Sequence, residues 1–305
     1  MSDLETRQLR YFVAVAQERH FGRAAERLGM AQPPLSRAVR DLERQLGVQL
    51  LIRTTRQVTL TPAGETLLAD AQVALDAVAA AEHRARHAGQ PAPTLRLALK
   101  ADYDAGLLPK ILDAYETLPV ELLLGGPGDQ VRALHRGRAD VALVPTPFDD
   151  GGLDTEPLLA GPTVVALAAA DPLAARTAVR LSDLAGRRLP DGTAAENGHP
   201  PMPLNGPRRD LSQIFNLVEV GTIVWFLPEW VARRFPRPNI AFRPVEELKP
   251  VTLMVAWPAA SRSPAVAAFV RTATRIAQVT VGDQWPAQAD AALTAAPVRN
   301  PAPGS

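Results

Sequence analysis

The chain has 305 residues, a formal net charge of +1 and no cysteine. At roughly 150 residues per domain, this length predicts about two domains. The lack of cysteine excludes disulfide frameworks, thiolate zinc sites and cysteine nucleophiles. Hydrophobic residues make up 47% and charged residues 21%, as in ordinary globular proteins. No apolar run approaches the ~18 residues that cross a bilayer, and no basic-then-apolar leader opens the chain, so we expect a cytoplasmic protein without a membrane segment.

The charge is distributed unevenly along the chain. Residues 1–60 hold ten Arg and six acidic residues, a charge of +4, whereas the rest of the chain carries −3. A basic head on a mildly acidic body is typical of a protein in which one segment binds a polyanion. Arg is the only basic residue of this head, which favours bidentate recognition of phosphate or guanine. On charge alone, a chance fluctuation explains the asymmetry equally well.

Three short helices are predicted in the basic head. Apolar residues recur at helical spacing over 6–19 and again over 21–28, and Gly29 suits the end of the second helix. A third helix opens with Pro33 and Pro34, which a first turn tolerates, and stops at Gly47. Its inner face consists of Leu35, Val39, Leu42 and Leu46. Short helices joined by tight turns predict a helix-turn-helix domain over 1–61, with the helix-turn-helix itself at about 21–40.

A wing and a long helix are predicted next. Residues 50–60 read as two short strands around a polar tip. Pro62 then begins a helix that runs to about His87, within a linker or dimerisation segment at 62–89, and Thr61 serves as its N-cap. Steps of four and three along this helix favour pairing with another helix, at Leu67, Ala71, Ala74, Val78, Ala81 and Ala85. The alternative is an Ala-rich helix packed on its own domain.

Strands and helices alternate over residues 94–282. The predicted strands are Leu95–Leu99, Val120–Leu124, Asp140–Val144, Thr163–Ala168, Ile223–Leu227 and Thr252–Trp257. The predicted helices are Ala105–Thr117, Asp129–Arg138 and Pro264–Val279. This order predicts a parallel α/β sheet with crossover helices. Residues 286–305, rich in Pro and Ala, are predicted to form a disordered tail.

The outer face of the third helix carries residue types that can recognise DNA. Gln can pair with adenine, and Arg can pair with guanine or bind phosphate, so such side chains near a helix N-terminus suit a major groove. Arg and Thr at the wing tip suit a minor groove and phosphate. The candidates are Gln32, Pro33, Pro34, Ser36, Arg37 and Arg40 on the helix, and Arg53, Thr54, Thr55 and Arg56 on the wing. For an isolated helix, a solvated face with ion pairs would be the better interpretation. The three helices and the wing together favour DNA.

Residues 4–64, with LRYFVAVAQERHFGRAAERLGMAQPPLSRAVRDLERQLGVQLLIRTTRQVTLTPAG, resemble the DNA-binding domain of LysR-type transcriptional regulators. Two positions depart from that pattern: Ala31 stands where Ser often caps the helix, and Leu51 where Phe is usual. The resemblance implies promoter DNA as partner, and a homodimer held through the linker helix, often a homotetramer built as a dimer of dimers. It also implies an effector-binding domain like periplasmic binding proteins, with two α/β subdomains. The first covers about 94–161 and 264–282, and the second about 162–263.

A small-molecule effector is expected in the cleft between these subdomains, where strands present their carboxyl ends. One wall would comprise Lys100, Ala101, Asp102, Gly126, Pro127, Gly128 and Thr146, and the other Thr163, Gly221 and Thr222. Asp102 stands where carboxylate-binding members often have a small hydroxyl residue, and a carboxylate beside a carboxylate is unfavourable unless Lys100 offsets it. This predicts a neutral, amine-bearing or aromatic effector rather than a simple dicarboxylate, with Ile223 and Trp225 narrowing the pocket. Alternatively, Asp102 or Asp104 only caps the next helix, or the regulator takes no ligand.

Enzymatic motifs are missing from the sequence. It contains no GxSxG elbow, no GxGxxG after a strand, no Walker loop and no HExxH. We therefore expect no catalytic residues, no metal and no cofactor. The alternative that remains is a solute-binding or enzymatic α/β protein whose first 90 residues form a helical oligomerisation module.

Overall fold

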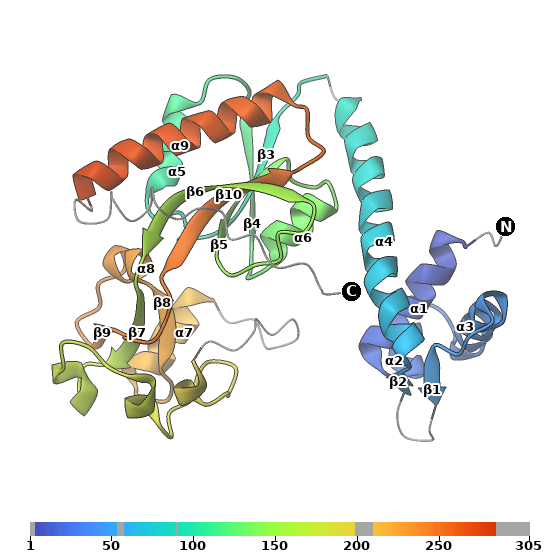
Figure 1. Cartoon of the computed structure of the whole chain (residues 1–305), viewed down its shortest axis with the longest axis horizontal. Helices are drawn as coiled ribbons and strands as arrows, with labels where there is room; N and C mark the ends of the chain where they lie inside the picture. Colours follow the sequence, from blue (N-terminus) through green and yellow to red (C-terminus); the bar gives the residue numbers. More distant parts are fainter. Residues whose placement is uncertain (1–3, 54–57, 90, 199–209, 285–305) are drawn as a thin grey trace, which may run out of the picture. The chain divides into compact units, whose positions relative to one another are not determined.

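The computed structural model describes residues 4–53, 58–89, 91–198 and 210–284. The chain divides into two units with separate cores. Figure 1 shows the elements of both units. The first unit comprises residues 1–90 with 135–138, and the second comprises the rest. The two units are described one at a time below.

Helices build the first unit (Figure 1). Its elements are α1 (Thr6–Glu18), α2 (Phe21–Arg27), α3 (Gln32–Leu46), β1 (Leu51–Arg53), β2 (Val58–Leu60) and α4 (Pro62–Ala88). Phe12, Leu35 and Leu42 are fully buried in the shared core. Gly47 ends α3 with a φ of 71°, a left-handed conformation that glycine adopts without strain. The three predicted helices, the paired wing strands and the long helix are confirmed.

Hydrogen bonds fix the wing to the helices on either side of it. The Glu43 carboxylate on α3 accepts from the amides of Leu50 and Leu51, at 2.9 and 3.1 Å. The Thr61 hydroxyl accepts from the Gly64 amide at 3.0 Å, so Thr61 is the N-cap of α4, as predicted. A carboxylate that accepts two backbone amides makes charge-assisted bonds, which are stronger than neutral ones. The start of β1 is therefore held to the helix that precedes it.

A five-stranded sheet in the order β4-β3-β5-β10-β6 forms the first half of the second unit. The strands are β3 (Leu95–Lys100), β4 (Val120–Gly125), β5 (Val141–Pro145), β6 (Leu153–Gly161) and β10 (Val251–Pro258). Helices α5 (Leu107–Ala114) and α9 (Pro264–Gln284) pack on one face, where Ile111 and Phe269 meet Leu97. Helix α6 (Asp129–His135) packs on the other face through Ala133 and Leu134.

A three-stranded antiparallel sheet, β8-β7-β9, forms the second half. Its strands are β7 (Thr163–Ala168), β8 (Trp225–Pro228) and β9 (Ile240–Pro244). Helix α7 (Leu211–Glu219) buries Phe215 on one face, and three 3₁₀ turns cover the other, at Pro172–Ala175, Leu181–Leu184 and Ala195–Asn197. Helix α8 (Glu229–Arg234) follows β8 directly. The chain crosses between the two sheets at 161–163 and again at 244–251, which gives two α/β subdomains.

The prediction of a parallel sheet is only partly right. Strands β4, β3 and β5 are parallel, but β10 runs antiparallel to both β5 and β6, and the second sheet is antiparallel throughout. The reason is connectivity, because the chain enters β10 on its return from the second subdomain and not through a crossover helix. The sequence reading missed β6, α7, α8 and β9, and α8 and β9 are only six and five residues long.

Two helices are shorter than predicted. Helix α5 begins at Leu107 and not at Ala105, because Ala105 and Gly106 both have left-handed backbones, with φ of 53° and 74°. Helix α6 ends at His135, two residues before the left-handed Gly137. Helix α9 is longer than predicted and ends at Gln284. The predicted tail at 286–305 lies outside the described residues.

Candidate nucleic-acid interface and effector site

Helix α3 separates its buried and exposed residues as predicted. Leu35, Val39 and Leu42 are at most 1% exposed and face the core. Ser36 is half-buried, and the opposite face is exposed at Gln32, Pro33, Pro34, Arg37 and Arg40. Two proline rings in the first turn stiffen the end of the helix that would enter a groove.

The arginines of α3 differ in their partners. Arg44 forms an ion pair with Asp41 at 2.8 Å, so the solvated-face interpretation holds there. Arg40 donates to the Ser36 hydroxyl at 3.2 Å and to its carbonyl at 3.3 Å. Arg37 makes no ion pair or hydrogen bond with any described residue. Its charge is therefore available to a ligand from outside this part of the chain.

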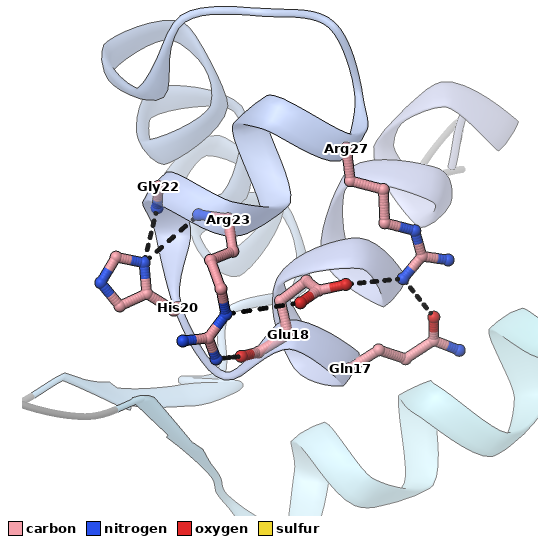
Figure 2. A network of polar contacts seen from close by, with 6 residues as sticks. All are labelled: Gln17, Glu18, His20, Gly22, Arg23 and Arg27. Atoms are coloured by element: carbon pink, nitrogen blue, oxygen red, sulfur yellow. Dashed lines mark hydrogen bonds and ion pairs between the residues drawn. The ribbon is translucent and has the colours of Figure 1, made fainter. Parts of the chain in front are cut away.

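Two arginines of α2 are held within the protein (Figure 2). Arg23 bonds to the Glu18 carbonyl and lies 3.5 Å from its carboxylate, and Arg27 contacts Gln17 at 2.9 Å and Glu18 at 3.3 Å. The same corner holds His20, whose Nδ1 accepts from the amides of Gly22 and Arg23 and so caps α2. These residues fix the angle between α1 and α2 rather than offering free charge.

The wing is described in part. Arg53 ends β1 opposite Val58 of β2. The other predicted wing residues, Thr54, Thr55 and Arg56, lie outside the described residues.

The first predicted wall of the effector site lies at one edge of the first sheet. Lys100 is the last residue of β3 and pairs in register with Gly125, the last residue of β4, and Thr146 follows β5 directly. The loop after β4 contains Gly126, Pro127 and Gly128. The Gly126 amide donates to Asp129 at 2.9 Å, and Gln130 donates to the Gly126 carbonyl at 3.1 Å. The three parallel strands thus bring their loops to one edge.

The second predicted wall fits less well. Thr163 is 2% exposed, and its hydroxyl donates to the Lys249 carbonyl at 2.8 Å, so its proton is already used. Gly221 and Thr222 are exposed in the turn after α7. Trp225 is buried, and its ring centre lies 5.7 Å from that of Phe215, so most of its side chain packs in the core, and its effect on a pocket stays a prediction. The tryptophan is a core residue of the second subdomain.

A residue that sequence reasoning missed lies against the first wall. Arg234, at the end of α8, has its Nε 3.8 Å from Asp102 Oδ1 and its Nη1 3.5 Å from Asp104 Oδ1. Asp104 also accepts from the Leu108 amide at 3.2 Å, which supports the capping alternative for Asp104 but not for Asp102. No sequence motif marks Arg234, because its partners are 130 or more positions away.

Lys100 has an unusual electrostatic environment. Its Nζ lies 3.5 Å from the centre of the Tyr103 ring. Burial lowers the pKa of Lys100 from its ordinary value of 10.5 to about 8, although the nearby Asp102 charge acts in the opposite direction. Burial also raises the pKa of Tyr103, so its ring stays neutral beneath the ammonium. A cation over an aromatic face is attracted by the electron-rich ring.

Two surface hollows lie away from these residues. One, of about 320 Å³, is lined by Glu156, Val270, Arg271, Thr274, Arg275 and Gln278. The other, of about 540 Å³, lies beside β9 and includes Asp171, Phe242 and Arg243. Among the described residues, no three His, Asp or Glu side chains are grouped as metal ligands. Nor does that part of the chain contain a helix long and apolar enough to span a bilayer.

Comparison with known proteins identifies the family. Residues 6–65 match the family described as "Bacterial regulatory helix-turn-helix protein, lysR family", and residues 88–191 match "LysR substrate binding domain". The Hca operon transcriptional activator HcaR of Escherichia coli is 33% identical over 299 residues, which covers 91% of this chain and all of that protein. AlsR of Bacillus subtilis, an HTH-type transcriptional regulator, is 30% identical over 269 residues, or 81% of this chain and 87% of that protein.

Solved structures agree with this result. Full-length BenM is 27% identical, with a TM-score of 0.51 over 91% of this chain and 98% of that one. CbnR, a LysR family transcriptional regulator, is 25% identical, with a TM-score of 0.51 over 90% of this chain and 99% of that one. These proteins are regulators, so the solute-binding or enzymatic alternative is wrong. The chain belongs to the LysR family: it is a transcriptional regulator that binds DNA through its helix-turn-helix domain and carries a substrate-binding domain.

Proposed function

We propose that this regulator reads promoter DNA with α3 and the wing. The observation that carries this proposal is the exposed Arg37, which has no partner among the described residues on a helix whose other face is fully buried. Bases would be read by Gln32, Ser36, Arg37 and Arg40, with Pro33 and Pro34 shaping the helix end. Backbone contacts would come from Arg53, Thr54, Thr55 and Arg56. Binding promoter DNA is the basis on which we assign the protein to the cytoplasm.

Two copies of α4 would join the regulator into a homodimer. Four of the six seam residues of α4 are exposed, namely Ala74, Val78, Ala81 and Ala85, whereas Leu67 and Ala71 pack into the core of the first unit. An apolar row that its own unit leaves open is typical of a helix that pairs with another helix. A second pairing would give a homotetramer. A symmetric dimer presents two recognition helices to a palindromic site.

The second unit would sense a small molecule. Lys100, Ala101, Asp102, Gly126, Pro127, Gly128 and Thr146 would contact the effector from one side, and Gly221 and Thr222 from the other. Thr163 would contact the effector only as an acceptor, because its hydroxyl proton is donated to the Lys249 carbonyl. A ligand that favours one arrangement of the two subdomains would shift the population of that arrangement, and with it the activity of the dimer on DNA.

The DNA contact is tested with Arg37→Ala. Affinity for the DNA upstream of the protein's own gene is measured by fluorescence anisotropy at several salt concentrations. Removal of a phosphate or base contact is expected to weaken binding by about 1–3 kcal/mol and, for a phosphate contact, to lower the salt slope by about one unit. Arg271→Ala is the matched control, because it removes the same charge from α9 in the other unit. If both variants bind like the wild type, Arg37 does not contact DNA.

A further inference from the structure

The ion pairs of Arg234 join the two subdomains of the second unit. Arg234 belongs to α8, which follows the second sheet, whereas Asp102 and Asp104 belong to the turn between β3 and α5 of the first. This turn is strained, since Asp102 and Ala105 have positive φ values of 66° and 53° without being glycines. Such residues cost of order 1 kcal/mol or more and cluster at ligand sites and switch regions.

The two carboxylates hold Arg234 in different ways. Asp104 is 3% exposed and uses both oxygens, one for the Leu108 amide and one for Arg234. Asp102 is more exposed, and its 3.8 Å separation from Arg234 is too long for a hydrogen bond. A partly exposed pair of this kind contributes about 1 kcal/mol or less. Asp102 is therefore the partner that a ligand can replace, while Asp104 keeps the guanidinium in place.

Lys100 supplies a second cation whose charge acts on the same carboxylate from beyond ion-pair distance. Its ammonium contacts the Tyr103 ring and interacts with the charge of Asp102. It makes no hydrogen bond to any described residue. Lys100 is half-buried, so its ammonium has lost part of its water without gaining an oxygen acceptor from the described residues. A ligand oxygen that carries negative charge would supply that compensation.

We propose that Lys100 and Arg234 recognise the effector together, and that they select a compound with a single carboxylate group. The effector carboxylate takes the position beside the two cations that the Asp102 side chain now occupies. A second carboxylate close to the first would also lie near Asp102 and be repelled by it, so the site favours a compound with one carboxylate. When the effector takes the place of Asp102, the ion pair between Asp102 and Arg234 is lost. That ion pair links α8 to the β3–α5 turn, so its loss couples effector binding to the arrangement of the two subdomains. This inference rests on the proposed sensing function and adds the ligand class and two residues.

The proposal is tested with probes that differ in charge but little in shape. Acetate, propionate and phenylacetate, with phenylacetamide and phenethylamine as neutral and cationic counterparts of phenylacetate, are added at up to about 10 mM to the full-length protein, and thermal stabilisation is recorded. We expect saturable stabilisation by at least one acid and a weaker effect of the amide and the amine. The proposal is overturned if the amide or the amine stabilises the protein more than the acids do. It is also overturned if none of the three acids gives saturable stabilisation.

Variants assign the effect to residues. Lys100→Met and Arg234→Gln are each expected to weaken binding of the acid about tenfold or more, as expected for loss of a charge-assisted contact. Asp102→Asn removes the competing carboxylate and is expected to tighten binding. Arg233→Gln, which neutralises the neighbouring arginine of α8, is the matched control, because Arg233 pairs with Glu229 on the exposed side of that helix. An Asp102→Asn variant that loses acid binding contradicts the exchange.

Operator binding without any probe is measured on the same variants. Lys100→Met and Arg234→Gln are expected to retain DNA binding, since neither residue belongs to the helix-turn-helix unit, and Arg234→Gln, which removes a link between the subdomains, is expected to change its strength. Normal DNA binding combined with wild-type acid binding in both variants refutes the ligand assignment and leaves the DNA-binding function intact. Conversely, an Arg37→Ala variant that loses DNA binding but binds the acid normally shows that DNA binding can be lost while effector binding is kept.

Discussion

At the scale of single residues, the arginines of the first unit differ in whether they are paired with other groups of the protein. Arg23 and Arg27 are held by Gln17 and Glu18 at one corner of the first unit (Figure 2), whereas Arg37 on the next helix has no described partner. Arg23 and Arg27 hold α1 and α2 together, whereas the charge of Arg37 is available for DNA. The distinction depends on which carboxylates lie within about 4 Å, and composition does not reveal it.

Burial of Lys100 makes stability depend on pH. Because its pKa is lowered from 10.5 to about 8, the unfolded state binds more protons than the folded state between these values, and the free energy of unfolding rises with pH in that window. Below about pH 8 the burial cost is present in full. Lys100→Met is therefore expected to stabilise the second unit at about pH 7, by on the order of 2 kcal/mol, with an advantage that shrinks toward about pH 10.

This prediction is checked by urea unfolding of both proteins at several pH values. Comparison with the wild type cancels the titration of the other groups. Lys100→Arg is the control, because an arginine stays charged throughout and should gain no stability as the pH rises. A constant difference between Lys100→Met and the wild type at every pH shows that Lys100 does not titrate in this range.

Gly64 marks a position where a side chain has no room. A Cβ at this position would lie 2.1 Å from the Leu50 carbonyl oxygen, which is backbone and cannot rotate away. Gly64→Ala is expected to destabilise the first unit by at least about 2 kcal/mol, through displacement of α4 from the strand entry. Gly89→Ala is the control, since its Cβ would have 3.6 Å to the nearest atom. Thermal unfolding measures both, and equal stability of the two variants contradicts the steric argument.

At the scale of elements, only the first part of the α4 seam packs against the core of the first unit, and the rest of the seam is exposed. Leu67 and Ala71 pack against the helix-turn-helix core near the start of the helix, and the seam residues after them are exposed. An amphipathic helix gains stability mainly from packing its apolar face. The exposed part of the seam supports the proposed homodimer, in which a second copy of the same helix would cover it.

The seam is tested with Val78→Arg. Val78 is 40% exposed at a seam position, and a charge there would be buried against the partner helix. We expect the dimer to dissociate at about tenfold or more higher protein concentration, measured by analytical ultracentrifugation. Val73→Arg is the matched control, because Val73 is 71% exposed and lies on another side of α4. A weakened dimer in the control but not in Val78→Arg places the interface elsewhere.

At the scale of the whole molecule, DNA recognition and ligand recognition are assigned to two units with separate cores. Phe12, Leu35 and Leu42 belong to a core that contains no residue of the second unit, whose sheets share a core around Leu97, Phe215 and Phe269. Separate cores can unfold separately. DNA recognition and ligand recognition are therefore built on scaffolds with their own stabilities.

Calorimetry tests this division. We expect two unfolding transitions, with Gly64→Ala lowering only one of them and a bound acid raising only the other. Arg37→Ala should leave both midpoints unchanged, because its side chain is exposed and has no described partner. A single transition that both Gly64→Ala and the acid shift equally contradicts independent units.

Much of the first unit was predictable from the sequence because it depends on local signals. The spacing of Leu35, Val39 and Leu42 defines the buried face of α3, Gly47 stops that helix, and Thr61 caps the next one. The family resemblance over 4–64 is confirmed for the same reason, since its motif lies within one continuous stretch. Helix periodicity and capping act over a few residues and can be read directly.

The effector unit depends on contacts between distant residues, and there sequence reading was incomplete. Lys100 and Asp102 were found because they follow a strand, but the antiparallel entry of β10 was not, since strand direction depends on how the chain returns from the second subdomain. Arg234 was missed because only the folded chain brings α8 next to the β3–α5 turn, 130 residues earlier. Local patterns therefore determined the family, the helix α3 proposed to read DNA and the arginines exposed on it. The tertiary structure alone decided which charges meet, because ion pairing depends on distance in space and not on position in the chain.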